Sequence, residues 1–157
     1  MGQTDRHFRY MISLLAKDVR LYTPMIHADA IVYSDKNFIK NENHRQKEVG
    51  IQIAGSDPDI VAAAATIIEQ HNYNEINLNV GCPSARVQNC SVGATLMKEP
   101  QRVARIIERL KKTTSLPVSI KTRIGVDNED SYQFLYDFVN QTSSAGCEHF
   151  IVHARKA

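Results

Sequence analysis

Long apolar runs are missing from this sequence, in which no window approaches the roughly eighteen continuous apolar residues that a membrane-spanning helix requires. Cysteine is scarce: the chain has Cys82, Cys90 and Cys147, and they form no CxxC pair. An odd number of cysteines cannot all pair within one chain, which argues against a secreted disulfide-stabilised domain. With no apolar signal segment after Met1, we expect a cytoplasmic protein with no membrane partner.

Phosphate-binding glycine motifs are also absent. No GxGxxG or GxxxxGK[ST] follows any apolar run, which removes the glycines that Rossmann dinucleotide folds and P-loop proteins need. The net charge does not indicate a class of partner, because 19 basic and 17 acidic residues leave a formal net charge of +2. Such a balance neither predicts nor excludes a nucleic-acid partner.

The remaining composition is that of a globular protein, since 157 residues with 43% hydrophobic and 23% charged side chains suffice for one domain with a core. Short β-branched apolar runs predict buried strands. Segments with apolar residues at three-and-four spacing predict helices. The predicted strands are 18–26, 48–55, 75–80, 116–123 and 149–155, and the predicted helices are 1–16, 56–71, 99–114 and 130–146.

Signals at the helix ends support these boundaries. Ser56 is a candidate N-cap with Pro58 in the following turn, Pro100 precedes the next helix, and Gly146 is suited to end the last one. Strand and helix alternate along the chain, which predicts right-handed crossovers and a parallel sheet of the α/β class. Both an open sheet and a (β/α)₈ barrel remain possible at this point.

In either architecture the chemistry gathers at the carboxyl ends of the strands. Each predicted strand has a polar or reactive group there. Gln52 is flanked by isoleucines, and a buried amide must find hydrogen-bond partners or cost on the order of 1 to 3 kcal/mol. The other candidates are Asn79, Cys82, Lys121, Arg123, His153 and Arg155.

Each candidate also has a simpler interpretation. A cysteine near a strand end is commonly a small buried hydrophobe, but Gly81 and Pro83 place Cys82 in a turn. One of the cations on the KxR strand end can be a solvated charge, and His153 can be a core histidine. A zinc site of Cys82, Cys90 and a histidine does not fit the usual ligand spacing. A Cys82–His153 pair for acyl transfer stays a minor alternative without local support.

The longest informative segment runs from Ile76 to Leu96. Its residues Ile76 to Pro83, followed by Val87 and by Gly93-Ala94, resemble the signature of the tRNA-dihydrouridine synthases. Five further blocks resemble the bacterial class that modifies positions 20 and 20a of the tRNA D-loop. They are "TDRHFR", "LYTPM", "IQIAGSDP", "VSIKTRIGVD" and "FIVHARKA".

The resemblance implies an FMN-binding (β/α)₈ barrel followed by a helical tRNA-binding domain. It identifies residues 1–157 as a single incomplete TIM-barrel domain that holds roughly strands 2 to 6, without the helical domain. The loops that bind the FMN phosphate would follow Ala157. Activity is therefore expected of the full-length protein, as a monomer, and not of these residues alone.

The resemblance also assigns roles to the candidates. Gln52, Lys121 and His153 match residues that contact the flavin, Asn79 and Arg123 match residues at the target uracil, and Cys82 matches the catalytic acid. No metal is implied. An unperturbed thiol has a pKa of about 8.5 and is mostly protonated near neutral pH, as a general acid must be. The implied reaction reduces the uracil C5=C6 bond in tRNA, with FMN as cofactor and NADPH as reductant.

Two residues depart from the family pattern. Cys90 stands where a glycine is usual, which puts a second thiol in the loop after Cys82, and Pro24 replaces an acidic residue in a predicted strand, where proline removes a hydrogen-bond donor. Two other functions stay open. One is a different FMN-dependent oxidoreductase acting on a free pyrimidine, and the other is an inactive or RNA-binding remnant.

Overall fold

A parallel β-sheet forms the centre of the protein. The computed structural model describes residues 4–16, 18–35, 39, 48–88 and 90–157. The strands follow the order β1-β3-β4-β5-β6, with β2 also paired to β3, and all pairs are parallel. The strands are β1 Leu21–Tyr22, β2 Ile26–His27, β3 Val49–Ala54, β4 Glu75–Val80, β5 Val118–Arg123 and β6 His149–His153.

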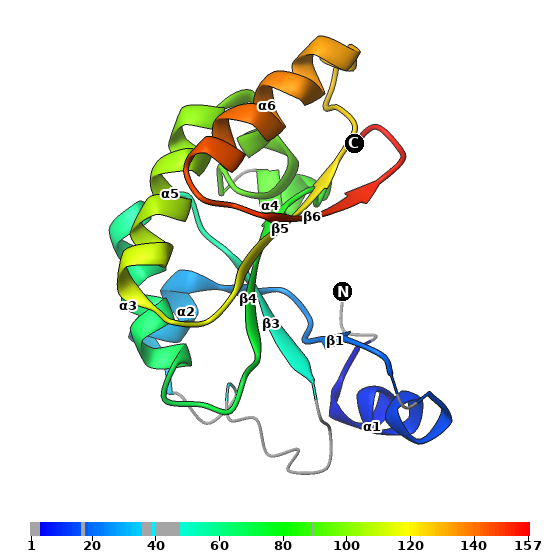
Figure 1. Cartoon of the computed structure of the whole chain (residues 1–157), viewed down its shortest axis with the longest axis vertical. Helices are drawn as coiled ribbons and strands as arrows, with labels where there is room; N and C mark the ends of the chain where they lie inside the picture. Colours follow the sequence, from blue (N-terminus) through cyan, green and yellow to red (C-terminus); the bar gives the residue numbers. More distant parts are fainter. Residues whose placement is uncertain (1–3, 17, 36–38, 40–47, 89) are drawn as a thin grey trace.

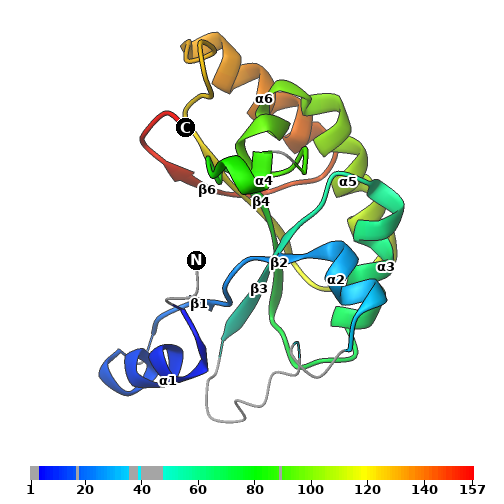
Figure 2. The ribbon, with the colours of Figure 1, turned by 180° about the vertical axis from the view of Figure 1, so that it is seen from behind.

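Helices cover one face of this sheet. Figures 1 and 2 show α2, α3, α5 and α6 on that side, while α1 lies beyond the β1 end of the sheet. The arrangement is part of a TIM-barrel wall, which confirms the predicted fold class. No helix in the described part of the chain is both long and apolar enough to cross a membrane. The helices are α1 Arg6–Leu15, α2 Ala28–Tyr33, α3 Pro58–Ile68, α4 Ala85–Gln88, the 3-10 helix η2 Gly93–Lys98, α5 Pro100–Thr113 and α6 Tyr132–Ser144.

Strand β4 occupies the middle of the sheet, and all six of its residues are buried. Ile76, Leu78 and Val80 belong to the hydrophobic core together with apolar residues of α3 and α5. Because side chains alternate along a strand, Glu75, Asn77 and Asn79 face the opposite side of the sheet. The helix-free face therefore carries polar groups in the middle of the sheet.

The helix ends mostly follow the sequence signals, with one correction. The prediction of Ser56 as the N-cap of α3 is wrong: the carboxylate of Asp57 caps this helix by accepting hydrogen bonds from the backbone N–H of Asp59 at 2.8 Å and of Ile60 at 3.2 Å. Asp57 directly precedes Pro58, which starts the helix, so its side chain reaches the first free N–H groups. Gly146 follows the end of α6 with a φ of 102°, as predicted.

The prediction of one strand over 18–26 is also wrong. This run forms two short strands, β1 and β2, with Thr23, Pro24 and Met25 between them. Pro24 has no N–H for the ladder. Beside it, the Thr23 hydroxyl accepts a hydrogen bond from the backbone N–H of Gln52 at 3.0 Å, so a side chain supplies an acceptor where the strand is interrupted.

Candidate functional site

A cavity of about 380 Å³ lies along the helix-free face, toward the carboxyl ends of β3, β4 and β5. Four predicted site residues, Gln52, Asn79, Cys82 and Lys121, line it together. Arg123 and His153 are not part of its lining. The remaining lining residues are Thr4, Tyr22, Thr23, Pro24, Met25, Asn77 and Ile151.

The end of β4 fixes the position of Cys82. The Asn79 side-chain oxygen Oδ1 accepts hydrogen bonds from the backbone N–H of Gly81 at 3.2 Å and of Cys82 at 3.0 Å. This turn closes on the neighbouring strand, because a Cβ atom at Gly81 would lie 3.2 Å from the backbone carbon of Thr122. Glycine at 81 allows this close approach, and the thiol follows directly at the cavity wall.

The loop after Cys82 returns to hold the carbonyl group of this cysteine. The backbone N–H of Ala94 donates a hydrogen bond to the Cys82 carbonyl at 3.0 Å. Gly93 has a φ of 74°, and a Cβ atom there would lie only 2.7 Å from the same carbonyl oxygen. A side chain at 93 would therefore be strained and would collide with Cys82. The Gly93-Ala94 pair thus holds the backbone of Cys82 in place.

The half-buried amide of Gln52 has the partners expected from the sequence. Its Nε2 donates to Oδ1 of Asn77 at 2.8 Å, and its Oε1 accepts from Nδ2 of Asn79 at 2.9 Å. The prediction that this glutamine must be paired is confirmed. Its orientation is fixed by two neighbours on β4.

Lys121 lies opposite Asn79 in the register of β4 and β5, and opposite Ile151 of β6. Its side chain is half-buried and lines the cavity. Among the described residues no carboxylate forms an ion pair with it. An ammonium group in this position is suited to a ligand that brings carbonyl oxygens or negative charge into the cavity.

Arg123 and His153 are placed differently. The Arg123 side chain donates from Nε to the Gly81 carbonyl at 2.8 Å and from a terminal nitrogen to the Lys156 carbonyl at 3.1 Å. It therefore ties the end of β4 to the segment after β6. His153 pairs with Arg123 in the strand register, and it is exposed at the end of β6. Their roles at the uracil and the flavin stay predictions.

The three thiols have different surroundings. Cys82 is half-buried, Cys90 is exposed, and Cys147 is fully buried. Burial raises the pKa of Cys147 to about 11, so this thiol stays protonated and inaccessible near neutral pH. Of these three, all within the described part of the chain, Cys82 alone lines the cavity beside Lys121.

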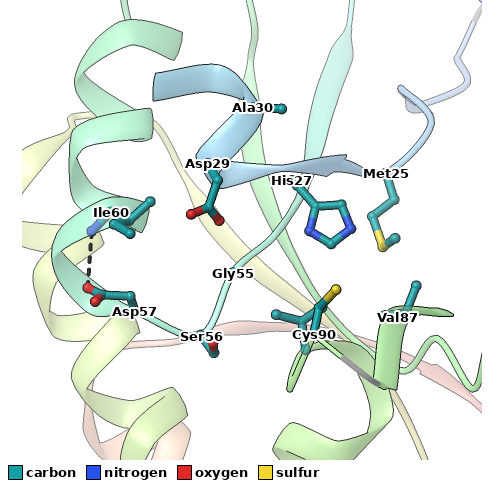
Figure 3. A pocket seen from close by; sticks show the side chains of 11 residues that line it. Met25, His27, Asp29, Ala30, Gly55, Ser56, Asp57, Ile60, Val87 and Cys90 are labelled. Atoms are coloured by element: carbon teal, nitrogen blue, oxygen red, sulfur yellow. Dashed lines mark hydrogen bonds between the residues drawn. The ribbon is translucent and has the colours of Figure 1, made fainter. Parts of the chain in front are cut away.

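A second cavity, of about 780 Å³, adjoins the first and shares Met25 with it. Figure 3 shows that His27 and Met25 approach it from β2 and the chain before it, while Val87 comes from α4 and Cys90 from the chain after this helix. Asp29 and Asp57 bring carboxylates to its wall, and Asp57 already uses one oxygen to cap α3. This cavity is not predicted from the sequence, since its lining comes from three separate segments of the chain.

The residues of the first cavity fit the ring of a flavin. A flavin ring has carbonyl oxygens and ring nitrogens along one edge, and the Lys121 ammonium and the amides of Gln52 and Asn79 supply donors. Tyr22, Met25 and Ile151 supply apolar surface. In the described residues this cavity has no glycine-rich loop for a phosphate, so the fit extends to the ring and not to the whole cofactor.

Several lining residues were missed at the sequence level. Asn77 lines the cavity and holds Gln52, yet Asn79 is the only asparagine of β4 among the predicted site residues. The sequence contains a signal for Asn77, because Glu75, Asn77 and Asn79 alternate with apolar residues and must share one face of the strand. Thr23 and Met25 gave no such signal, since the break between β1 and β2 decides their placement.

Comparisons with known proteins agree with this geometry. The family model described as dihydrouridine synthase matches residues 1–157. A tRNA-dihydrouridine(20/20a) synthase of Synechocystis sp. is 46% identical over 157 residues, covering all of this chain and 47% of the relative. The proteins of the same name from Vibrio vulnificus and Escherichia coli K12 are 48% and 47% identical over 155 residues, covering 98% of this chain and 47% and 45% of their own lengths.

The chain thus spans about half the length of the curated relatives that it matches. The match includes the turn from Asn79 to Pro83 and the loop that ends at Gly93-Ala94, which are the segments that place Cys82 at the cavity. By its sequence over the full length of the chain, this protein belongs to the dihydrouridine synthase family.

Proposed function

We propose that this chain carries the flavin-ring and uracil sites of a tRNA-dihydrouridine synthase that reduces a uridine at position 20 or 20a of the tRNA D-loop. The observation that carries this proposal is the placement of the Cys82 thiol in one cavity with Asn79 and Lys121. The names of the relatives support the choice of substrate. The proposal concerns the whole protein, because the chain covers about half of each relative.

The chemistry divides between cofactor and protein. FMN, when bound, would supply the hydride for the uracil C5=C6 bond, with NADPH as its reductant. The chain would bind and orient the two reacting partners. Gln52 and Lys121 would hold the flavin ring, with His153 as a further contact, while Asn79 would bind the uracil and Arg123 would hold the turn beside it.

Cys82 would donate the proton to C5 of the uracil. Its backbone is held on both sides, by Asn79 through its N–H and by Ala94 through its carbonyl, so the thiol keeps its place when the substrate enters. A fixed donor is what general acid catalysis requires, since the proton must be within hydrogen-bond reach of the carbon that receives it. The half-buried side chain leaves a path for the thiol to regain a proton from water.

The partner would be tRNA, and the target uridine must leave its stack to enter a cavity of this size. The wider neighbouring cavity has room for a nucleotide next to the target. Its carboxylates Asp29 and Asp57 disfavour phosphate, so we expect a base or ribose there rather than the backbone. A tRNA substrate implies a cytoplasmic location, and we expect a monomer.

A chimera tests the function. Residues 1–157 replace the matched stretch of the Synechocystis relative, and the chimera is expressed in bacteria that lack dihydrouridine at positions 20 and 20a. We expect mass spectrometry of the isolated tRNA to show the modification restored, and the Cys82→Ala chimera to leave it absent. The 157-residue chain, assayed beside it, is expected to show neither visible flavin absorbance nor dihydrouridine, because its cavity offers the ring site alone.

Two results would contradict the proposal. A folded, flavin-loaded chimera that leaves tRNA unmodified would favour an inactive or RNA-binding remnant. A chimera that reduces free pyrimidines and not tRNA would identify the other class of FMN-dependent oxidoreductase.

A further inference from the structure

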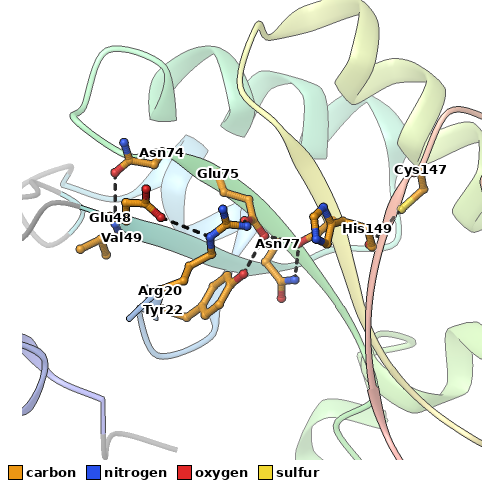
Figure 4. A network of polar contacts seen from close by, with 10 residues as sticks. Arg20, Tyr22, Glu48, Val49, Asn74, Glu75, Asn77, Cys147 and His149 are labelled. Atoms are coloured by element: carbon orange, nitrogen blue, oxygen red, sulfur yellow. Dashed lines mark hydrogen bonds and ion pairs between the residues drawn. The ribbon is translucent and has the colours of Figure 1, made fainter. Parts of the chain in front are cut away.

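A continuous chain of hydrogen bonds crosses the helix-free face of the sheet. It runs from Glu75, at the amino end of β4, to Cys82 after its carboxyl end. Figure 4 shows its beginning, where Arg20 and Tyr22 surround Glu75, with Asn77 as the next polar residue of β4. From there the chain passes through side chains of β3, β4 and β5 that are neighbours in register. Its members, in order, are Glu75, Ser119, Asn77, Gln52 and Asn79.

One end of the chain is a carboxylate. Glu75 is 3% exposed and accepts hydrogen bonds from Arg20 at 3.1 Å, from the Tyr22 hydroxyl at 2.9 Å and from the Ser119 hydroxyl. Burial and this contact with Glu75 raise the pKa of Tyr22 to about 12, so Tyr22 stays a donor. An ionised carboxylate has acceptors only. The Ser119 proton must therefore point toward Glu75.

The other end of the chain consists of donors only. The backbone N–H groups of Gly81 and Cys82 point at Asn79 and require an acceptor there. The Asn79 side chain must present Oδ1 to them, which leaves its Nδ2 to face Gln52.

The residues between these ends can adopt one arrangement. A carboxamide has an oxygen end and a nitrogen end of nearly equal shape, and its orientation is set by its hydrogen-bond partners. Since the Ser119 hydroxyl donates to Glu75, it accepts from Nδ2 of Asn77 at 2.6 Å. Asn77 then turns its oxygen to Nε2 of Gln52 at 2.8 Å, and Gln52 turns its oxygen to Asn79. Each of the three amides therefore points its nitrogen toward the Glu75 end of the chain and its oxygen toward the Cys82 end.

We propose that Glu75 is a positioning residue that sets this direction and thereby determines which atoms the cavity presents to a ligand. Gln52 and Asn79 each use one N–H within the chain and line the cavity, so each has a second N–H for a bound molecule. Together with the Lys121 ammonium they form a row of donors. Such a row selects the carbonyl-bearing edge of a ring.

The direction has a consequence for substrate choice, which rests on the proposed function. Uracil presents a carbonyl oxygen at C4, where cytosine presents an amino group. The second N–H of Asn79, the residue assigned to the uracil, accepts the first and opposes the second, because two donors cannot pair. A reversed Asn79 would favour the wrong base and would leave the N–H of Cys82 without a partner. Glu75 contributes to this selection without contact to the ligand.

The experiment compares Glu75→Gln with Glu48→Gln in the 157-residue chain. Glu48 also pairs with Arg20, at 3.6 Å, but its carboxylate is exposed and lies outside the chain of hydrogen bonds. Hydrogen exchange of the side-chain amides is followed by NMR in isotope-labelled protein. In Glu75→Gln we expect exchange at Asn77, Gln52 and Asn79 to become about five- to tenfold faster, because a carboxamide at 75 can donate to Ser119 as well as accept from it and no longer fixes the direction of the chain. Glu48→Gln should leave all three rates unchanged.

The readout separates positioning from general stability. Backbone exchange within β4 serves as the internal reference, and we expect it to change less than the side-chain rates. Equal acceleration of backbone and side chains, or no change at Asn79, would overturn the proposal. If Glu75→Gln does not fold, Ser119→Ala interrupts the same chain without a charge, and the same result is expected of it.

A second measurement connects the chain of hydrogen bonds to the reaction. In the Synechocystis chimera, Glu75→Gln is expected to lower kcat/KM for uridine in tRNA about tenfold, since roughly one hydrogen bond to the base loses its orientation. Unchanged kcat/KM would overturn the role in substrate choice. A chimera that is inactive in every form would count against the proposed function, whereas the NMR rates would still decide the role of Glu75.

Discussion

Strands β4 and β6 both carry predicted site residues, yet they present them in opposite ways. Every residue of β4 is buried, and its polar side chains are hydrogen-bonded to strands on both sides. Strand β6 lies at the edge of the sheet, with His149 and His153 exposed and Val152 44% exposed. The same alternation of side chains thus gives a fixed site in the centre and a loosely held one at the edge.

The number of neighbouring strands decides how firmly a polar side chain is held. Asn77 has Gln52 of β3 on one side and Ser119 of β5 on the other, so both ends of its amide are held. His153 has β5 on one side only among the described residues.

The largest effect is expected from the thiol at the end of β4. Replacing Cys82 with alanine in the Synechocystis chimera should lower dihydrouridine formation about 10²- to 10⁴-fold, the usual contribution of a general acid. Flavin absorbance should be retained, because the ring contacts lie elsewhere in the cavity. Cys90→Ala is the matched control and should keep near-normal activity. Equal rates for the two variants would show that Cys82 is not the acid.

The second test compares buried and exposed polar residues of the two strands. Asn77→Leu should lower the free energy of unfolding by about 2 to 3 kcal/mol, because Gln52 and Ser119 each lose a buried partner. His149→Leu, at an exposed position of β6, should change it by less than about 0.5 kcal/mol. Both values come from urea denaturation. Similar losses at the two positions would contradict the contrast between centre and edge.

A smaller loss is expected in the loop that follows β4. Gly93→Ala should destabilise the protein by about 1 to 2 kcal/mol, because residue 93 has a positive φ and its new Cβ would meet the Cys82 carbonyl. The shift would also move Cys82, so turnover of the chimera should fall. Ala94→Gly, which keeps the N–H that binds Cys82, is the control for loop composition. A fully stable and active Gly93→Ala variant would contradict the close approach.

The smallest change concerns Cys147, just before β6. Its pKa of about 11, raised by burial above the ordinary value of a thiol, means that folding favours the protonated thiol. The resulting stabilisation is present below pH 9 and is lost as the pH rises toward 11. Iodoacetamide at pH 8 should modify Cys82 and Cys90 and leave Cys147 unmodified, as seen by mass spectrometry. Labelling of all three in protein with native circular dichroism would contradict this burial.

Local patterns predicted much of the fold. The run from Glu75 to Val80 was predicted with both ends correct, because its alternating apolar residues and the flanking glycine leave no other arrangement. The region 18–26 could not be predicted as two strands from residue preference alone. There the backbone of Pro24 and a side-chain bond from Thr23 to β3 decide the outcome, and such a bond depends on a strand far away in sequence. The short α2 and η2 carry too few residues to show a helical period.

The site was predictable in part. Gln52, Asn79, Cys82 and Lys121 were recognisable as polar groups at strand ends, and the structure brings them to one cavity. The link from Glu75 to Asn79 was not recognisable, because it depends on the register that puts Gln52 opposite Asn77 and Asn77 opposite Ser119. Register between strands is a property of the assembled sheet.

The placement of Lys121 has a thermodynamic consequence. Its ammonium is half-buried opposite Asn79 and is paired with no carboxylate among the described residues, so it can interact with an electron-rich oxygen of a ligand. A ring that places such an oxygen there binds the folded chain and not the unfolded one, so ligand binding and folding favour each other. Flavin should consequently raise the melting temperature of the Synechocystis chimera, and less so when position 121 is uncharged.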